Sequence, residues 1–259
     1  IVFSLEGGDI FFENLVASGK NPVIVDLESM FHTFIDDPSV MSARKAEQAF
    51  LHRSVTGIGI LPQPSKGSLA DEVFDISVLG AKTMSQAPYE VPGLENFGRD
   101  DMRMSSIPGW IPENHASSEN EFGYKNFSEE CFLGLSAGFE FLRNYSSEIT
   151  KDYGILDQCF DGAIRRLIVR DTKVYGFLQQ DETHPDLLRD QLDRQLYLDN
   201  LWADLKHRPN LEYFISSELN QMQSGDIPYF SGPVSDNWVE GCDGNIIHLD
   251  PISKESPLK

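Results

Sequence analysis

The chain has 259 residues, of which 40% are hydrophobic and 11% aromatic, so it is long and apolar enough to fold around a sizeable core. Its formal net charge is −20, from 21 Lys and Arg against 41 Asp and Glu. This excess of negative charge opposes general binding to nucleic acid or anionic membranes, because both depend on cationic contacts. No run approaches the roughly 18 to 20 apolar residues of a membrane span, and we expect no span.

The three cysteines are far apart and follow no CxxC or Cys/His metal-binding spacing; they are Cys131, Cys159 and Cys242. We interpret them as reduced thiols of a cytoplasmic protein. The chain starts at Ile1 without a signal-peptide pattern, and a structured hairpin follows almost at once. We therefore expect the sequence to be a fragment of a longer protein.

The hairpin is predicted within residues 7–29, GGDIFFENLVASGKNPVIVDLES, where the turn SGKNP separates two apolar runs. Pairing of these runs would bring Asp9, Asn14 and Asp26 to one end. Two carboxylates and an amide oxygen suit Mg²⁺ that holds a nucleotide's phosphates. The first acid could also accept a hydroxyl proton during phosphoryl transfer. On spacing alone, the alternative is that Asp9 and Asn14 are turn residues and Asp26 ends a strand.

The middle of the chain contains two segments with different predicted structure. Residues 40–56 have apolar positions at helical spacing and predict a helix. Residues 57–118 are interrupted repeatedly by Gly, Pro and Ser and predict a long irregular segment. If Asp26 binds a metal, this segment has the position of an activation loop in a kinase, and we expect it to receive the peptide substrate. The alternative is a poorly ordered insertion.

The second half is predicted to be helical, with apolar stripes that pack in the core. The predicted helices are residues 127–149, 184–205 and 210–226, the last of which is expected to stop at Gly225. His184 precedes a proline and is interpreted as a helix start rather than as a base. The segment GDIPYF, residues 225–230, is expected to be structural.

The segment RRLIVRDTK, residues 165–173, gathers four basic residues in an acidic chain and is a candidate anion site. If residues 166–172 run extended, Arg166, Arg170 and Thr172 share one face. The opposite face would then carry Leu167 and Val169. The following helix would be capped by Asp171 or Thr172, and its N-terminus favours phosphate. The alternative is that these arginines pair with surrounding acids.

Several segments resemble a known family. The pattern GD, four residues, NLV, a turn and VIVD resembles the catalytic loop and metal-binding segment of lipid kinases. Residues 12–32 are closer to the dehydratase domain of class II lanthipeptide synthetases. Further matches to that family occur in order, at residues 97–104, 165–175, 184–202 and 208–230.

The resemblance implies an enzyme that uses ATP and Mg²⁺ to phosphorylate Ser and Thr of a precursor peptide with leader and core parts. It would then eliminate the phosphate to leave dehydroalanine or dehydrobutyrine. Asp9 would face the substrate hydroxyl, and Asn14 and Asp26 would bind the metal and nucleotide. Arg166 and Thr172 would serve elimination, and Arg170 would be a further contact to the phosphates.

One position departs from the family, whose loop resembles Asp-x-His-x-x-Asn. Here Phe11 stands at the His position, and a phenyl ring can neither donate nor accept a hydrogen bond as an imidazole does. Phosphorylation could therefore be weak, and the alternatives are an inactive kinase-like module that binds a peptide and a kinase-like enzyme with another substrate. Glu28 could support the metal site or be an ordinary surface residue.

We predict an α+β fold, the C-terminal lobe of a kinase-like dehydratase. Its parts would be a catalytic hairpin at 1–35, a helix and activation-loop-like segment at 36–120, a helical body at 121–250 and a tail at 251–259. Partners within the same polypeptide would be an N-terminal lobe, which supplies a Lys to the nucleotide, and a cyclase domain. The fragment alone is expected to be inactive.

Overall fold

The computed structural model describes residues 1–19, 21–35, 50–51, 53–66, 73–80, 85–111 and 127–252. The fold is α+β, as predicted. It divides into two compact units, which we describe separately. The hairpin unit comprises Gly8–Leu27 and Leu51–Arg143, and the helical unit comprises Ile1–Gly7, Glu28–Phe50 and Asn144–Lys259. Most of the helix predicted at 40–56 lies outside the described residues.

The hairpin unit begins with the predicted β-hairpin. Strand β1 (Leu15–Ser18) pairs antiparallel with β2 (Asn21–Ile24), from Leu15 opposite Ile24 to Ser18 opposite Asn21. Gly19 in the turn has φ 62°, a conformation that glycine adopts without a steric penalty. The prediction of a hairpin here is therefore confirmed, and it fixes the register of the residues on either side.

A second antiparallel ribbon occupies much of the segment that the sequence predicted to be irregular. Strand β5 (Ser85–Glu95) pairs with β6 (Arg103–Ile111), with a register shift between Gln86 and Glu90. Its strands contain prolines, which suggested loops. In a two-stranded ribbon each strand has an outer edge, where a missing N–H costs no ladder hydrogen bond. Two short strands, β3 (Ser65–Lys66) and β4 (Val73–Phe74), pair before it.

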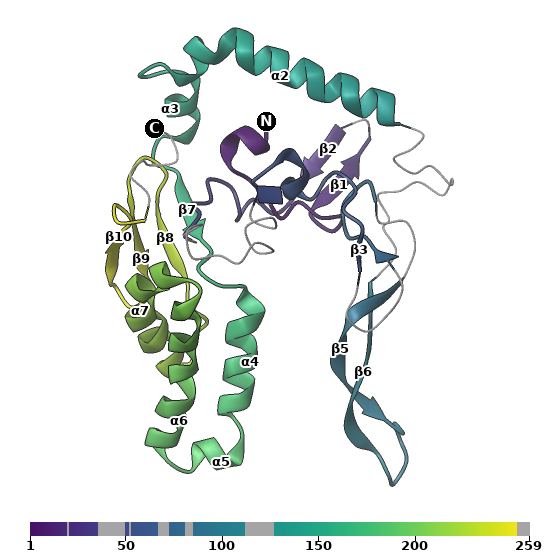
Figure 1. Cartoon of the computed structure of the whole chain (residues 1–259), viewed down its shortest axis with the longest axis vertical. Helices are drawn as coiled ribbons and strands as arrows, with labels where there is room; N and C mark the ends of the chain where they lie inside the picture. Colours follow the sequence, from purple (N-terminus) through teal and green to yellow (C-terminus); the bar gives the residue numbers. More distant parts are fainter. Residues whose placement is uncertain are drawn as a thin grey trace. The chain divides into compact units, whose positions relative to one another are not determined.

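The helical unit is built on a four-stranded antiparallel sheet in the order β10-β9-β8-β7 (Figure 1). The strands are β7 (Ile164–Leu167), β8 (Phe230–Pro233), β9 (Trp238–Gly241) and β10 (Ile246–His248). Helix α7 (Glu212–Gln223) packs on this sheet, with the rings of Phe214 and Phe230 edge to face at 5.4 Å. Leu167 and Val169 are buried in the same core.

The segment predicted as one helix at 184–205 is broken into three. These pieces are α5 (Pro185–Leu188), α6 (Gln191–Leu198) and the 3-10 helix η5 (Asp199–Lys206). Asp190 starts α6 by accepting a hydrogen bond from Leu192 N at 2.8 Å, which interrupts the preceding turn. His184 caps α5, in agreement with its interpretation as a helix start. Of the predicted leucine stripe, Leu198 and Leu201 are buried. The prediction is wrong for Leu188, Leu192 and Leu196, which are exposed.

The remaining elements are helical. They are η1 (Phe3–Leu5), η3 (Val55–Ile58), α2 (Ser128–Thr150), α3 (Ile155–Phe160), α4 (Thr172–Glu182) and η6 (Pro209–Leu211). Helix α2 forms where it was predicted, but its stripe does not lie in a core: Phe132 and Phe139 are exposed. Helix α7 ends before Gly225, as expected. Among the described helices, none is long and apolar enough to cross a membrane.

Candidate functional site

The loop that precedes β1 is closed by its own side chain. The Nδ2 atom of Asn14 donates to the carbonyl oxygen of Asp9 at 2.8 Å, and Asn14 N donates to Phe11 O at 2.9 Å. Asp9 has φ 58°, the left-handed conformation in which Asp is one of the more tolerated residues. The first two residues of the predicted constellation are therefore joined by a direct contact.

The third residue lies at the same end of the hairpin. Val25 N donates to Asn14 O at 3.0 Å, which extends the ladder one step beyond the pair of Leu15 and Ile24. Asp26 follows directly after Val25. The structure thus brings the backbone of Asp9, Asn14 and Asp26 to the open end of the hairpin.

Backbone hydrogen bonds to two other segments hold this loop. Ile10, which is fully buried, donates its N–H to Ile58 O at 2.8 Å. Gly59 has φ 94°, and a Cβ there would lie 2.8 Å from Ile10 O. On the other side, Phe12 N donates to Ile76 O at 3.2 Å. The catalytic-loop candidate is therefore fixed from both sides within the hairpin unit.

Phe11, which stands where the family that the sequence resembles has His, is part of this packing. It forms an isolated antiparallel bridge with Ser77. One edge carbon of its ring lies 3.1 Å from the place where a Cβ on Gly59 would be. The side chain is half-buried and contributes packing but no polar group.

The donor atoms at the hairpin end fit a magnesium ion shared with a nucleotide. Because Nδ2 of Asn14 is used by Asp9, Oδ1 is the atom of this amide left to bind a cation. Asp26 offers a carboxylate on an exposed residue. In the part of the chain that the structure describes, no three His, Cys, Asp or Glu residues could hold a metal by themselves. A site with few protein ligands is the usual arrangement for Mg²⁺ bound with phosphates.

The predicted anion segment begins on β7 of the helical unit. Nη1 of Arg166 forms an ion pair with the carboxylate of Glu28, which is half-exposed. The guanidinium carbon of Arg166 also lies 5.0 Å from the ring centroid of Tyr229. Glu28 and Tyr229 were not assigned to this site by the sequence. Their positions could not be read from local spacing, because both contacts join distant parts of the chain.

The neighbouring Arg165 points into the core. It is 2% exposed, and its Nη1 donates to the hydroxyl of Thr33. Burial lowers the pKa of Arg165 below its ordinary value, while the charge of Glu6 acts in the opposite direction. Its Nε and Nη2 have no hydrogen-bond partner within the described residues. Arg165 and Arg166 thus occupy opposite faces of β7, as alternation along a strand requires.

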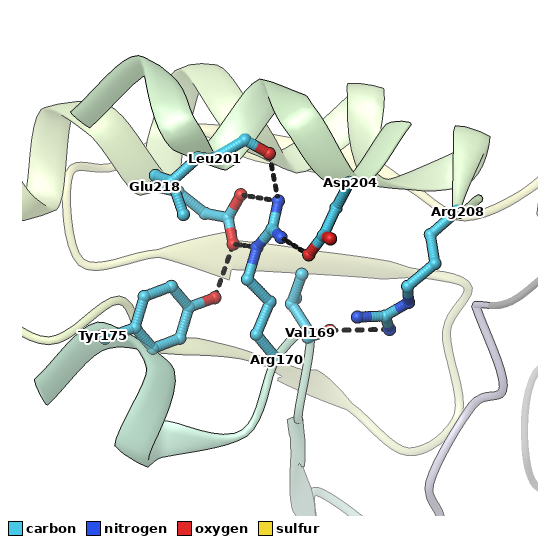
Figure 2. Close-up of polar contacts among 7 residues, drawn as sticks. All are labelled: Val169, Arg170, Tyr175, Leu201, Asp204, Arg208 and Glu218. Carbon is cyan, nitrogen blue, oxygen red and sulfur yellow. Dashed lines mark hydrogen bonds and ion pairs between the residues drawn. The ribbon is translucent and has the colours of Figure 1, made fainter. Parts of the chain in front are cut away.

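Arg170 lies in a buried polar network (Figure 2). Its Nε donates to Glu218 Oε1 at 2.8 Å, and its Nη1 donates to Asp204 Oδ2 at 2.6 Å. Nη2 donates to the carbonyl oxygen of Leu201 at 2.9 Å. The guanidinium is engaged on every nitrogen, so for Arg170 the alternative interpretation holds: it pairs with acids of its own chain.

Tyr175 completes this network. Its hydroxyl bonds to Glu218 Oε1, and burial, followed by the charge of Glu218, raises the pKa of Tyr175 well above its usual range. The tyrosine therefore stays neutral and donates to the carboxylate. A buried charge pair with these extra hydrogen bonds has the geometry of a structural clamp between α4, η5 and α7.

Thr172 is the first residue of α4 and is exposed. The helix is capped by Asp171, whose side chain accepts from Lys173 N at 3.2 Å. This confirms one of the two predicted caps. Residues 168–171 are not a strand, so the extended arrangement with Arg166, Arg170 and Thr172 on one face does not form. Within the described structure, no hydrogen bond joins Thr172 to Arg166.

Comparison with known proteins assigns the chain to a family. Residues 1–232 match the family described as "Domain of unknown function (DUF4135)", and the chain belongs to that family. The chain is also 26% identical over 260 residues to the lacticin 481/lactococcin biosynthesis protein LcnDR2 of Lactococcus lactis subsp. lactis. That similarity covers 95% of this chain and 26% of the relative, so the chain spans about a quarter of the relative's length.

Proposed function

We propose that this chain is the C-terminal lobe of a kinase-like dehydratase in a class II lanthipeptide synthetase. The family match and the similarity to a protein named for lacticin 481 biosynthesis support a role in lantibiotic biosynthesis. The observation that carries the proposal is the closed loop in which Asn14 bonds to Asp9 at one end of a hairpin, with Asp26 at the same end. Local hydrogen bonds within one unit fix this arrangement.

In the first step, the carboxylate of Asp9 accepts the proton of a Ser or Thr hydroxyl. The hydroxyl oxygen forms a bond to the γ-phosphorus of ATP, and ADP leaves with the electrons of the broken P–O bond. Asn14 and Asp26 would hold Mg²⁺, which when bound would neutralise charge on the nucleotide's phosphates. The product is a phosphorylated precursor peptide.

In the second step, Arg166 and Thr172 assist the loss of phosphate. A base removes the α-proton of the phosphorylated residue, a carbon–carbon double bond forms, and the C–O bond breaks. Phosphate leaves with that bond's electrons. Arg166 suits this role because a guanidinium can bind two phosphate oxygens and stabilise the charge that builds on them. Arg170 stabilises the fold through its hydrogen bonds to Glu218 and Leu201 and does not bind phosphate.

The substrate, the cellular compartment and the partner domains follow from the same proposal. The substrate is a precursor peptide with leader and core parts, and the reaction takes place in the cytoplasm. In kinase-like domains the nucleotide binds between two lobes, so the active enzyme requires an N-terminal lobe in addition to these residues. A cyclase domain of the same polypeptide is a further proposed partner.

The test uses the full-length protein that contains this chain, with ATP, Mg²⁺ and a precursor peptide encoded beside it. We expect a mass loss of about 18 Da for each Ser or Thr that is dehydrated. Asp9→Asn removes the proton acceptor with little change in size and should abolish the loss. An unchanged peptide mass in the wild-type reaction would refute the proposal.

Phe11 favours a second candidate, a kinase-like module that binds the peptide without turnover. Its phenyl ring supplies packing against Gly59 where the family has a hydrogen-bonding side chain. This candidate predicts that the wild-type protein binds the precursor peptide and Mg²⁺–ATP but leaves the peptide mass unchanged. The same mass measurement therefore separates the two.

A further inference from the structure

Arg166 is held on two sides. Its Nη1 pairs with the carboxylate of Glu28, and its guanidinium carbon lies 5.0 Å from the ring centroid of Tyr229. The Arg166 side chain is 20% exposed, and its Nε and Nη2 make no hydrogen bond within the part of the chain that is described. Those two nitrogens form the edge with which a guanidinium binds two oxygens of a phosphate. One edge of Arg166 is thus available to an anion while its other nitrogen is engaged.

The register of the sheet explains why Tyr229 reaches Arg166. Arg166 lies opposite Ser231, and side chains two residues apart on a strand share a face. Tyr229, just before β8, is therefore the diagonal neighbour of Arg166, a separation that aromatic side chains span. Its backbone N–H donates to Oε1 of the buried Gln221 at 2.9 Å. The ring is attached at a fixed point of the sheet rather than on a free loop.

We propose that Tyr229 is a positioning residue, which holds the Arg166 guanidinium so that Nε and Nη2 face the phosphate of a phosphorylated Ser or Thr residue. This inference rests on the proposed function, because that function makes Arg166 a phosphate ligand. The face of an aromatic ring attracts a guanidinium and restricts its rotation. The ion pair with Glu28 holds Nη1, and the Tyr229 ring lies against the guanidinium. Together these two contacts restrict rotation of the Arg166 side chain away from the phosphate.

The exposure of Tyr229 separates this role from core packing. Tyr229 is 40% exposed, whereas Tyr175, in the buried network around Arg170, is 2% exposed. The hydroxyl of Tyr229 makes no hydrogen bond among the described residues. Removal of the ring therefore leaves no closed cavity, and the interaction that it makes with Arg166 depends on the ring face rather than on the hydroxyl.

The experiment measures binding of a short synthetic peptide with one phosphoserine, and of its serine counterpart, to the full-length protein by fluorescence anisotropy. Tyr229→Ala should weaken phosphopeptide binding about five- to tenfold, and Tyr229→Phe should stay within about twofold of wild type, because phenylalanine keeps the ring face. Tyr213→Ala is the matched control, since Tyr213 is 46% exposed and makes no hydrogen bond or cation–π contact with an arginine in the described structure. None of the variants should change binding of the serine peptide.

The same proteins are then given ATP, Mg²⁺ and the precursor peptide. Tyr229→Ala should accumulate phosphorylated peptide, which gains about 80 Da per site, relative to dehydrated peptide. A general loss of fold would lower both products together and would also lower binding of the serine peptide. The partition between the two products therefore reports the position of Arg166.

Three results would overturn the inference: Tyr229→Ala binds the phosphopeptide as wild type does, Tyr229→Phe loses as much as Tyr229→Ala, or the wild-type protein does not distinguish the two peptides. A different result concerns the proposed function alone. If the wild type binds the phosphopeptide through Tyr229 but never dehydrates the precursor, the phosphate site stands and the dehydratase assignment falls.

Discussion

Arg170 and Glu218 form a buried ion pair in which Nε lies 2.8 Å from Oε1, with the two side chains 2% and 0% exposed. They come from the anion segment, residues 165–173, and from the middle of α7, 48 residues apart. Asp204 and the carbonyl oxygen of Leu201 take the remaining donors of Arg170, and Tyr175 bonds to the carboxylate. The pair therefore fixes the segment that leads from β7 into α4.

Substitution of Arg170 should strongly destabilise the helical unit. Arg170→Ala leaves the Glu218 carboxylate buried without its cation, at a cost of about 3–5 kcal/mol in local unfolding free energy. Hydrogen exchange of α7 amides in the full-length protein measures this cost. Arg189→Ala, which removes an exposed pair with Asp193, should cost about 0.2–1 kcal/mol. Equal effects of the two substitutions would show that the buried pair is not a clamp.

Replacing both partners should be milder than replacing one. In Arg170→Met with Glu218→Leu, no unpaired charge remains in the core, so the double variant should be more stable than Arg170→Ala. The measurement is again hydrogen exchange of α7. The loss of stability in the double variant could instead equal the sum of the losses in Arg170→Met alone and Glu218→Leu alone. That result would contradict a direct interaction between these side chains.

Asp243 should make stability sensitive to acid. Burial raises the pKa of Asp243, but hydrogen bonds lower it by more, so the pKa lies below its ordinary value; the donors are Ser217, Asn220 and Asn245. Because the folded pKa is below the unfolded one, the contribution is complete above the unfolded pKa and is lost as pH falls through the folded pKa. Asp243→Asn should therefore reduce stability at neutral pH and weaken its fall in acid. Asp236→Asn, at an exposed side chain, should change neither in thermal unfolding scans across that pH range.

Gly59 should be intolerant of any side chain. Its φ is 94°, and a Cβ would lie 2.8 Å from the carbonyl oxygen of Ile10. Gly98 also has positive φ, 77°, but nothing lies within 4 Å of its Cβ position. Gly98→Ala should cost about 1–2 kcal/mol for conformation alone, and Gly59→Ala should cost more and disturb the Asp9 loop. If both lose equal stability in thermal unfolding, Ile10 does not contact Gly59 as described.

The sequence predicted what local chemistry determines. The turn and the two apolar runs were sufficient for the β1–β2 hairpin, and with it the common end shared by Asp9, Asn14 and Asp26. The stop of α7 before Gly225 likewise follows from one residue's backbone preference. In each case the determining residues are a few positions apart, so no knowledge of tertiary contacts was needed.

Tertiary contacts account for what was missed. The partner of Arg170 is 48 residues away, and no spacing rule selects Glu218 among 41 acids. Tyr229 was expected to be structural, because only the register of β7 against β8 brings it to Arg166. The β5–β6 ribbon was missed for another reason: its prolines lower strand propensity, and an edge position tolerates them.

Phe11 offers a direct test of the phosphorylation step. If Asp9 and Asn14 act as proposed, an imidazole at position 11 restores a hydrogen-bonding group beside the phosphates, and Phe11→His should raise the initial rate of phosphorylation at least about tenfold. The rate is measured as ADP release that depends on the precursor peptide. Phe12→His is the control, because it adds the same group one residue away, next to a backbone N–H already bonded to Ile76 O. A rate unchanged by Phe11→His, or raised equally by Phe12→His, would mean that position 11 does not face the reacting phosphoryl group.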